Sequence, residues 1–313
     1  MKRCLMWVGV GVLVACQPGG DGGRRFLSLG TGGTGGVYYP LGGALASRLS
    51  LADSAHQYTA EVTGGSVENV NRVVSGDIDL GFSMANTMHQ AFHGGPDYPQ
   101  PVVRIRAVAP LYPNVVHAVV SRNSSARGLA DLRGKRVAVG SPGSGTEMAS
   151  RELLEAHGIT YDDIDARYLS FRESSDALRD GAIDAAIIAA GYPASAVLEA
   201  VSSAGARLIP IASPEIVALA AERSYLGLGE IPPGAYPGVD AAVPTVVLMN
   251  WIVAREDLDS AVVYLVLDIL QDDKASLVRV HKIAEQIDLS VLRDEPPIPL
   301  HSAAAKWKER ELR

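Results

Sequence analysis

Cysteine is almost absent from the 313-residue sequence, because the two that occur, Cys4 and Cys16, both stand near the N-terminus. The rest of the chain can therefore form no disulfide and has no cysteine metal ligand or cysteine nucleophile. Aromatic residues make up 6% of the sequence, so an aromatic pair beside a predicted site is informative. These scarcities direct attention to the small polar residues and the glycines.

Positive charge is also scarce. The sequence has 28 Lys and Arg against 35 Asp and Glu, a formal net charge of −7, and no run of basic residues. This composition argues against nucleic acid as a partner. A hydrophobic fraction of 47% with 20% charged residues is typical of a globular protein, and 313 residues are enough for two lobes of ordinary size.

Long apolar runs are missing outside the N-terminus. Residues 1–15 combine a basic start with an apolar stretch too short to span a membrane, which predicts a signal peptide. Residues 13–16, Leu-Val-Ala-Cys, resemble a bacterial lipobox, which predicts cleavage before Cys16 and lipidation of its thiol; the alternative is an ordinary signal peptide with a chance cysteine. Residues 16–24 read as a flexible tether. We therefore expect a periplasmic lipoprotein anchored to a membrane through Cys16.

Glycine is abundant, and it concentrates in two similar stretches. Residues 26–40, FLSLGTGGTGGVYYP, predict a buried strand, a glycine-rich loop and a helix that resumes at residue 41. Residues 136–147, RVAVGSPGSGTE, repeat the arrangement ahead of a helix over 148–157. Glycine lets the backbone approach a ligand, and loop amides at a helix N-terminus favour an anion. Two such units predict two lobes that direct helix N-termini at a shared cleft for a small carboxylate or similar anion.

The similarity extends further along both halves. After the first loop we expect a strand at 58–63, a helix at 67–75, the turn GDID at 76–79 and a strand at 80–83. The second half repeats this order with a strand at 167–171, a loop at 172–175, a short helix at 176–180, the turn GAID at 181–184 and a strand at 185–189. A duplicated α/β lobe with a mostly parallel sheet follows, with Asp79 and Asp184 holding equivalent turns. Ligands bind such sheets beyond the carboxyl ends of the strands, where the glycine-rich loops fall.

Nucleotide binding and catalysis are poorly supported. Residues 30–35 match G-x-G-x-x-G, but the acidic residue expected about 20 positions later is represented only by Asp53, at a helix end. The loop 140–146 lacks the lysine of a phosphate-binding loop. His89 and His93 share a helical face without the intervening glutamate of a zinc motif, so surface roles are favoured over metal binding. The sequence predicts no enzyme, no metal and no cofactor.

The tyrosines near the glycine-rich loops have two interpretations. Tyr38 and Tyr39 stand side by side in a strand-to-helix turn, where they can line the cleft or simply pack the helix on the sheet. Tyr192 follows the second-half strand at 185–189 and faces the same region if the repeat holds. Both interpretations stay open from the sequence.

Five segments together resemble the TAXI-type substrate-binding proteins of TRAP transporters. They are residues 30–44, 63–69, 131–147, 232–238 and 299–301. The resemblance implies a two-lobe type II periplasmic-binding-protein fold, each lobe a mostly parallel sheet flanked by helices, with the ligand cleft between them. Lobe 1 would comprise residues 25–118 and 243–313, and lobe 2 residues 119–242. A monomeric binding protein of this kind captures a small organic acid or amino acid and delivers it to a TRAP-type membrane permease.

The resemblance also implies a set of ligand contacts. In the first lobe these are Thr34, Gly35, Gly36, Tyr38, Tyr39, Ser66 and Asn69; in the second they are Ser144, Gly145, Thr146 and Tyr192.

The chain departs from the family at Asn86, in Met-Ala-Asn, where a Gln-Ser-Asp-like segment is usual. Asn86 cannot supply the negative charge that pairs with a ligand amine, so we expect a preference for a non-amino carboxylate. A lipid-tethered ligand-sensing subunit of a signalling system remains an alternative function, which the sequence does not separate from transport.

Overall fold

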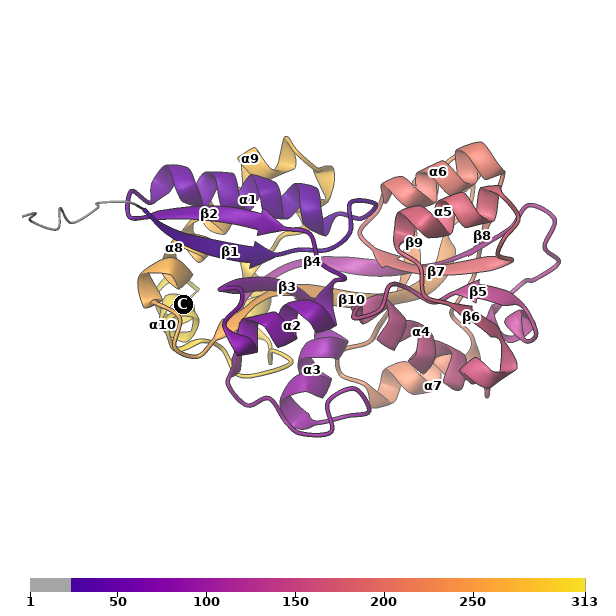
Figure 1. Cartoon of the computed structure of the whole chain (residues 1–313), viewed down its shortest axis with the longest axis horizontal. Coiled ribbons are helices and arrows are strands. Elements are labelled where there is room, and N and C mark those ends of the chain that lie inside the picture. Colours follow the sequence, from indigo (N-terminus) through magenta and orange to yellow (C-terminus); the bar gives the residue numbers. More distant parts are fainter. Residues whose placement is uncertain (1–23, 313) are drawn as a thin grey trace, which may run out of the picture.

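A computed structural model describes residues 24–312 and has two lobes built on one mixed, ten-stranded sheet (Figure 1). The sheet order is β2-β1-β3-β10-β4-β7-β5-β6, with β8 paired to β4 and β9 paired to β10. The predicted signal peptide at 1–15, the lipidation site Cys16 and all but the last residue of the tether lie outside the described residues. Over residues 24–312, none of the helices has the length and apolar character that a membrane crossing requires.

The first lobe joins the N-terminal part of the chain to its C-terminal helices. Its parallel strands are β1 (Arg25–Gly30), β2 (His56–Glu61) and β3 (Leu80–Met84). Its helices are α1 (Tyr38–Ala52), α2 (Ser66–Ser75), α3 (Ala85–His93), α8 (Ser260–Asp272), α9 (Lys274–Val278) and α10 (Ser302–Glu311).

The second lobe repeats the three-stranded parallel unit with β5 (Arg136–Ala138), β6 (Asp165–Arg167) and β7 (Ala185–Ala190). Its further elements are α4 (Gly145–Glu155), α5 (Phe171–Arg179), α6 (Ser195–Ala204), α7 (Pro214–Glu222), β8 (Arg207–Ile209) and β9 (Gly227–Ile231). Short 3-10 turns cover Leu129–Leu132, Tyr161–Asp163, Lys282–Gln286 and Leu289–Arg293.

The start of α5 corrects the sequence prediction, which placed a strand up to residue 171 and a loop at 172–175. The Ser170 hydroxyl accepts a hydrogen bond from the Glu173 N–H at 3.3 Å, and the Glu173 carboxylate accepts one from the Ser170 N–H at 2.8 Å. This capping box starts the helix at Phe171 and ends the preceding strand early.

Two long antiparallel strands, β4 (Ile105–Val120) and β10 (Val243–Arg255), pass through both lobes and connect them (Figure 1). Tyr112 of β4 packs in the first-lobe core, whereas Val115 packs in the second. These crossing strands make the sheet mixed, where we expected mostly parallel strands. The predicted lobe boundaries at 118/119 and 242/243 fall near the end of β4 and at the start of β10. The residues of each strand change from one lobe's hydrophobic core to the other's nearer the middle of the strand.

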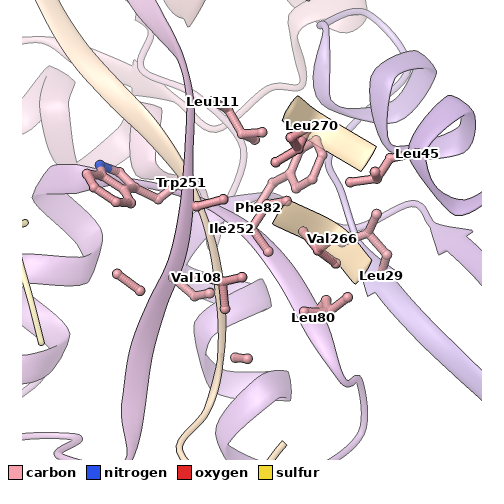
Figure 2. Packing of buried hydrophobic residues seen from close by; sticks show 14 of the residues in the cluster. Leu29, Leu45, Leu80, Phe82, Val108, Leu111, Trp251, Ile252, Val266 and Leu270 are labelled. Carbon is pink, nitrogen blue, oxygen red and sulfur yellow. The ribbon is translucent and has the colours of Figure 1, made fainter. Parts of the chain in front are cut away.

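The first-lobe core lies between the sheet and its helices (Figure 2). Leu29 and Phe82 from the parallel strands are fully buried, as is Val266 from α8. Trp251 and Ile252, adjacent in β10, point to opposite faces of the sheet, so both faces carry buried side chains. Because helices cover both faces, the strands here are apolar over most of their length.

The internal repeat is confirmed by a pair of equivalent contacts. The Asp79 carboxylate accepts a hydrogen bond from the Ser28 N–H at 2.8 Å, and the Asp184 carboxylate accepts one from the Arg136 N–H at 2.9 Å. Each aspartate therefore holds the turn before its strand against the first strand of its lobe. The sequence predicted this role for both aspartates.

Candidate functional site

A cavity lies where the two lobes meet, at the N-terminal ends of α1, α2, α4 and α5. The space not filled by atoms, with the open solvent at its mouth included, is about 520 Å³. Its lining residues are Gly32, Gly33, Gly36, Val37, Tyr38, Gly64, Gly65, Ser66, Met84, Tyr112, Asn114, Ser141, Ser144, Gly145, Thr146, Ser170, Phe171, Ala189 and Ala190.

The four helix ends give the cavity its electrostatic character. The first N–H groups of a helix have no intrahelical acceptor and carry the positive end of the helix dipole. The residues preceding α1 and α2, Val37 and Gly65, provide no side-chain cap. At the end of α2 the Glu68 N–H donates to the Gly143 carbonyl, and the first N–H groups of both helices are not taken up by a capping side chain. None of the lining residues found within 24–312 has a charged side chain. The cavity is therefore positive through its backbone, which suits an anion.

The Ser144 hydroxyl serves mainly as a helix cap. It accepts a hydrogen bond from the Glu147 N–H at 3.1 Å and donates one to the Ser141 carbonyl at 2.7 Å. Its proton is thus already donated within the loop. The family resemblance implied that Ser144 contacts the ligand, and that role stays a prediction.

A hydrogen-bonded network of buried and partly buried side chains forms one wall of the cavity. The Tyr38 hydroxyl donates to Asn250 Oδ1. Asn250 Nδ2 donates to the Tyr112 carbonyl at 2.8 Å and to Asn114 Oδ1 at 2.7 Å, and Asn114 Nδ2 donates to the Ala189 carbonyl at 3.2 Å. Burial raises the pKa of Tyr38, so its hydroxyl keeps its proton. The network ties α1 to both crossing strands and to β7.

Glycines allow the lobes to approach each other closely beside the cavity. A Cβ atom on Gly145 would lie 2.8 Å from Ser66 Oγ and 2.9 Å from Thr87 Oγ1, both in the other lobe. A Cβ on Gly64 would lie 2.6 Å from the Pro142 carbonyl oxygen. The sequence argument assigned the glycines of these loops to ligand approach. In the structure they also form the contact between the lobes.

Hydrogen bonds cross between the lobes on both sides of the cavity. The Glu68 N–H of α2 donates to the Gly143 carbonyl at 3.0 Å. The Ser195 hydroxyl of α6 donates to the Gly35 carbonyl, also at 3.0 Å. The structure therefore represents a closed arrangement in which the cavity is shared between the lobes.

Half of the predicted ligand contacts line the cavity. They are Gly36, Tyr38, Ser66, Ser144, Gly145 and Thr146. The other six, Thr34, Gly35, Tyr39, Asn69, Asn86 and Tyr192, do not line it.

Asn69 has a structural role that explains its position. Its Nδ2 donates to the Thr31 carbonyl at 2.6 Å and to the Phe82 carbonyl at 2.8 Å, and its Oδ1 accepts from the Thr63 hydroxyl at 2.8 Å. The fully buried amide thus holds the strand ends of β1 and β3 and has no donor left for a ligand.

Asn86 and Gly35 lie at the junction of the lobes. Asn86 Nδ2 donates to the Gly145 carbonyl at 3.3 Å, and Gly35 accepts the bond from Ser195. Tyr39 is 39% exposed and faces away from the core. Tyr192 packs at the edge of a second-lobe hydrophobic cluster. As ligand contacts, these residues remain predictions.

The sequence reasoning did not name five lining residues with polar or aromatic side chains as ligand contacts: Tyr112, Asn114, Ser141, Ser170 and Phe171. Asn114 follows Pro113 and directly precedes the apolar run 115–120, and it is only 3% exposed. A polar residue at the edge of such a run was an available signal. Phe171 was assigned to the end of a strand because the capping box that starts α5 was not recognised.

Solved structures share this architecture at low sequence identity. PhnD1 from Prochlorococcus marinus, in complex with methylphosphonate, matches with a TM-score of 0.57 and 14% identity, over 91% of this chain and 96% of that one. The alkanesulfonate-binding protein SsuA from Xanthomonas axonopodis pv. citri, bound to MOPS, gives 0.51 and 18%, over 92% and 91%. An ancestral arginine-binding protein bound to arginine gives 0.50 and 16%, over 85% and 99%.

These likenesses confirm the two-lobe periplasmic-binding-protein fold, and at such identities they concern the fold alone. The amino-acid sequence relates this chain to a protein family directly. The model of the NMT1-like family matches residues 29–310, nearly the whole of the described chain. The chain therefore belongs to the NMT1-like family.

Proposed function

We propose that this protein is an extracytoplasmic solute-binding protein that captures a small organic anion between its lobes and delivers it to a membrane permease. The convergence of four helix N-termini on a cavity with no charged lining side chain, within residues 24–312, carries the proposal. Backbone N–H donors neutralise an anion there without a fixed cation. The fold relatives bound to methylphosphonate and to MOPS hold ligands of compatible chemistry.

Closure provides the capture mechanism. A ligand that receives donors from both lobes binds the closed arrangement more tightly than the open one and shifts the population toward it. The inter-lobe bonds at Gly143 and Gly35 then add to the stability of the closed form. The permease would recognise this form.

The finer assignment is a TAXI-type TRAP transporter component, anchored in the periplasm through a lipid on Cys16. It rests on the glycine-rich motifs at 30–44 and 131–147 and on the lipobox-like residues 13–16. A lipid-tethered sensing subunit would use the same closure to report to a signalling partner. Metabolic labelling with a clickable fatty acid, compared between the wild-type chain and Cys16→Ser, tests the anchor.

The ligand class is tested by a thermal-shift panel on residues 24–313, after unfolding and refolding to remove any bound solute. Pyruvate, 2-oxoglutarate, succinate, methanesulfonate, methylphosphonate and glutamate are each added at millimolar concentration. We expect the melting temperature to rise with one class of acid that lacks an amino group, because a ligand that binds only the native state stabilises it. Equal affinity for glutamate and 2-oxoglutarate contradicts the non-amino preference, and no shift with any acid contradicts the proposed function.

A further inference from the structure

Tyr112 has a hydroxyl group that the protein itself leaves unpaired. Its side chain is fully buried, and among residues 24–312 no hydrogen-bond partner lies within reach of Oη. Other buried polar atoms without partners occur, but Tyr112 is the one such residue in the described chain that also lines the cavity. A buried hydroxyl without a partner lowers stability. At a binding site, an atom of the bound ligand can form the missing hydrogen bond.

The tyrosine is held firmly in place. Its carbonyl accepts the hydrogen bond from Asn250 Nδ2 at 2.8 Å. A Cβ atom on Gly191 would lie 2.9 Å from Tyr112 Cε2, so the glycine provides the room in which the ring packs. Tyr112 therefore lines the cavity from a fixed position, at the point where β4 crosses between the lobes.

The hydroxyl is suited to donate. Burial raises the pKa of Tyr112 well above its usual value, so the group stays protonated. The neighbouring Tyr38 hydroxyl already donates to Asn250. A ligand oxygen can accept a hydrogen bond from the Tyr112 hydroxyl. The positive helix ends around the cavity also favour an oxygen that carries negative charge.

We propose that Tyr112 is a specificity-determining residue that donates a hydrogen bond to an oxygen of the bound solute, so that the site selects small oxoanions with an oxygen placed against the β4 crossing. This assignment rests on the proposed function and specifies how its ligand is recognised. A solute that lacks an oxygen at this position leaves the hydroxyl unpaired and binds weakly.

The experiment compares Tyr112→Phe, which removes only the hydroxyl, with the wild-type protein. The ligand-free variant is expected to melt at the same temperature or higher, because it loses an unpaired buried group. The ligand is the acid that binds the wild-type protein most tightly among pyruvate, 2-oxoglutarate, succinate, methanesulfonate and methylphosphonate. We expect the Kd of the variant for this acid, measured by calorimetry, to rise at least about tenfold. The control is Tyr58→Phe: the Tyr58 hydroxyl donates to Asp53 at 2.9 Å, away from the cavity, so this change should lower the melting temperature and leave Kd unchanged.

Two results overturn the assignment while leaving the proposed function intact. One is a Kd for Tyr112→Phe within twofold of wild type. The other is a lower melting temperature of the ligand-free variant, which would mean that the hydroxyl has a structural partner. If no acid binds the wild-type protein, the proposed function fails, and the role of Tyr112 fails with it.

Discussion

Asn250 and Asn114, on the two strands that cross between the lobes, are joined by a hydrogen bond of 2.7 Å from Nδ2 to Oδ1. Both side chains are buried, and Asn250 also donates to the Tyr112 carbonyl and accepts from the Tyr38 hydroxyl. One amide thus links the crossing strands to each other and to the helix that forms a wall of the site.

Replacement of Asn250 by alanine should therefore destabilise the whole protein. The change leaves buried partners without hydrogen bonds, which costs about 3 kcal/mol in the free energy of unfolding. Urea denaturation followed by circular dichroism measures this. Asn71→Ala, at an exposed position of α2, is the matched control and should change stability by less than about 0.5 kcal/mol. A loss below about 1 kcal/mol for Asn250→Ala would show that the network contributes little.

Gly145→Ala should hold the cleft open. The added Cβ would lie 2.8 Å from Ser66 Oγ and 2.9 Å from Thr87 Oγ1, contacts that exist only when the lobes are closed. We expect ligand affinity to fall more than about tenfold with little change in the free energy of unfolding, because only the closed state loses stability. Calorimetry and small-angle scattering with saturating ligand measure the two effects.

Gly43→Ala provides the control for this substitution. Nothing lies within 4 Å of a Cβ at that position of α1. The change should leave affinity unaltered and raise helix stability slightly. Normal closure in Gly145→Ala would mean that the Ser66 and Thr87 side chains move aside.

Arg151 of α4 joins the lobes from a position outside the cavity, where Nη2 contacts both carboxylate oxygens of Asp97 at 2.7 and 2.8 Å. The side chains are about a quarter exposed, at 25% and 27%. Arg151→Gln should weaken ligand binding by about 1 kcal/mol, roughly fivefold, because the pair forms on closure. Calorimetry at low and high salt should show that the difference shrinks as salt increases.

The matched control is Arg167→Gln, which removes an exposed pair with Asp165 inside the second lobe. This local pair does not change on closure, so Kd should stay the same. An equal effect of the two substitutions would show that general charge, and not the inter-lobe contact, sets the affinity.

His117 should make the protein less stable in mild acid. Its Nδ1 contacts the Ile188 carbonyl at 3.0 Å and its Nε2 contacts the Tyr236 hydroxyl at 2.9 Å, which fits a neutral ring. Burial lowers the pKa of His117 to about 4, against 6.5 in the unfolded chain. Between these values the unfolded chain binds the proton and the folded one does not, so stability falls as the pH drops from 6.5 and levels off below 4.

Urea denaturation at several pH values measures this effect, which amounts to at most about 3 kcal/mol. His117→Gln should be less stable than wild type at pH 7, and its stability should fall less steeply between pH 6.5 and 4. Parallel pH profiles for the two proteins would assign the acid sensitivity to other groups.

Much of the fold is a consequence of local sequence. The strand, glycine loop and helix order at 26–52 and 136–155 appears in the structure close to the predicted positions. The repeated Gly-x-Ile-Asp turns also act as predicted, because glycine ends each helix in the left-handed conformation and the aspartate bonds the neighbouring strand. The start of α5 could have been predicted as well, since Ser170 and Glu173 have the spacing of a capping box.

The details of the site depended on contacts between distant segments. Asn114 and Asn250 are 136 positions apart and meet only because β4 and β10 pair as they cross between the lobes. Tyr112 stands between Pro110 and Pro113, where the sequence predicts no regular strand, and its hydroxyl is left unpaired only by the packing of distant segments around it. Local sequence determined where the loops and helix ends form, because turns and caps depend on neighbouring residues. Tertiary structure decided which side chains line the cavity, because closure brings together residues that no short-range pattern connects.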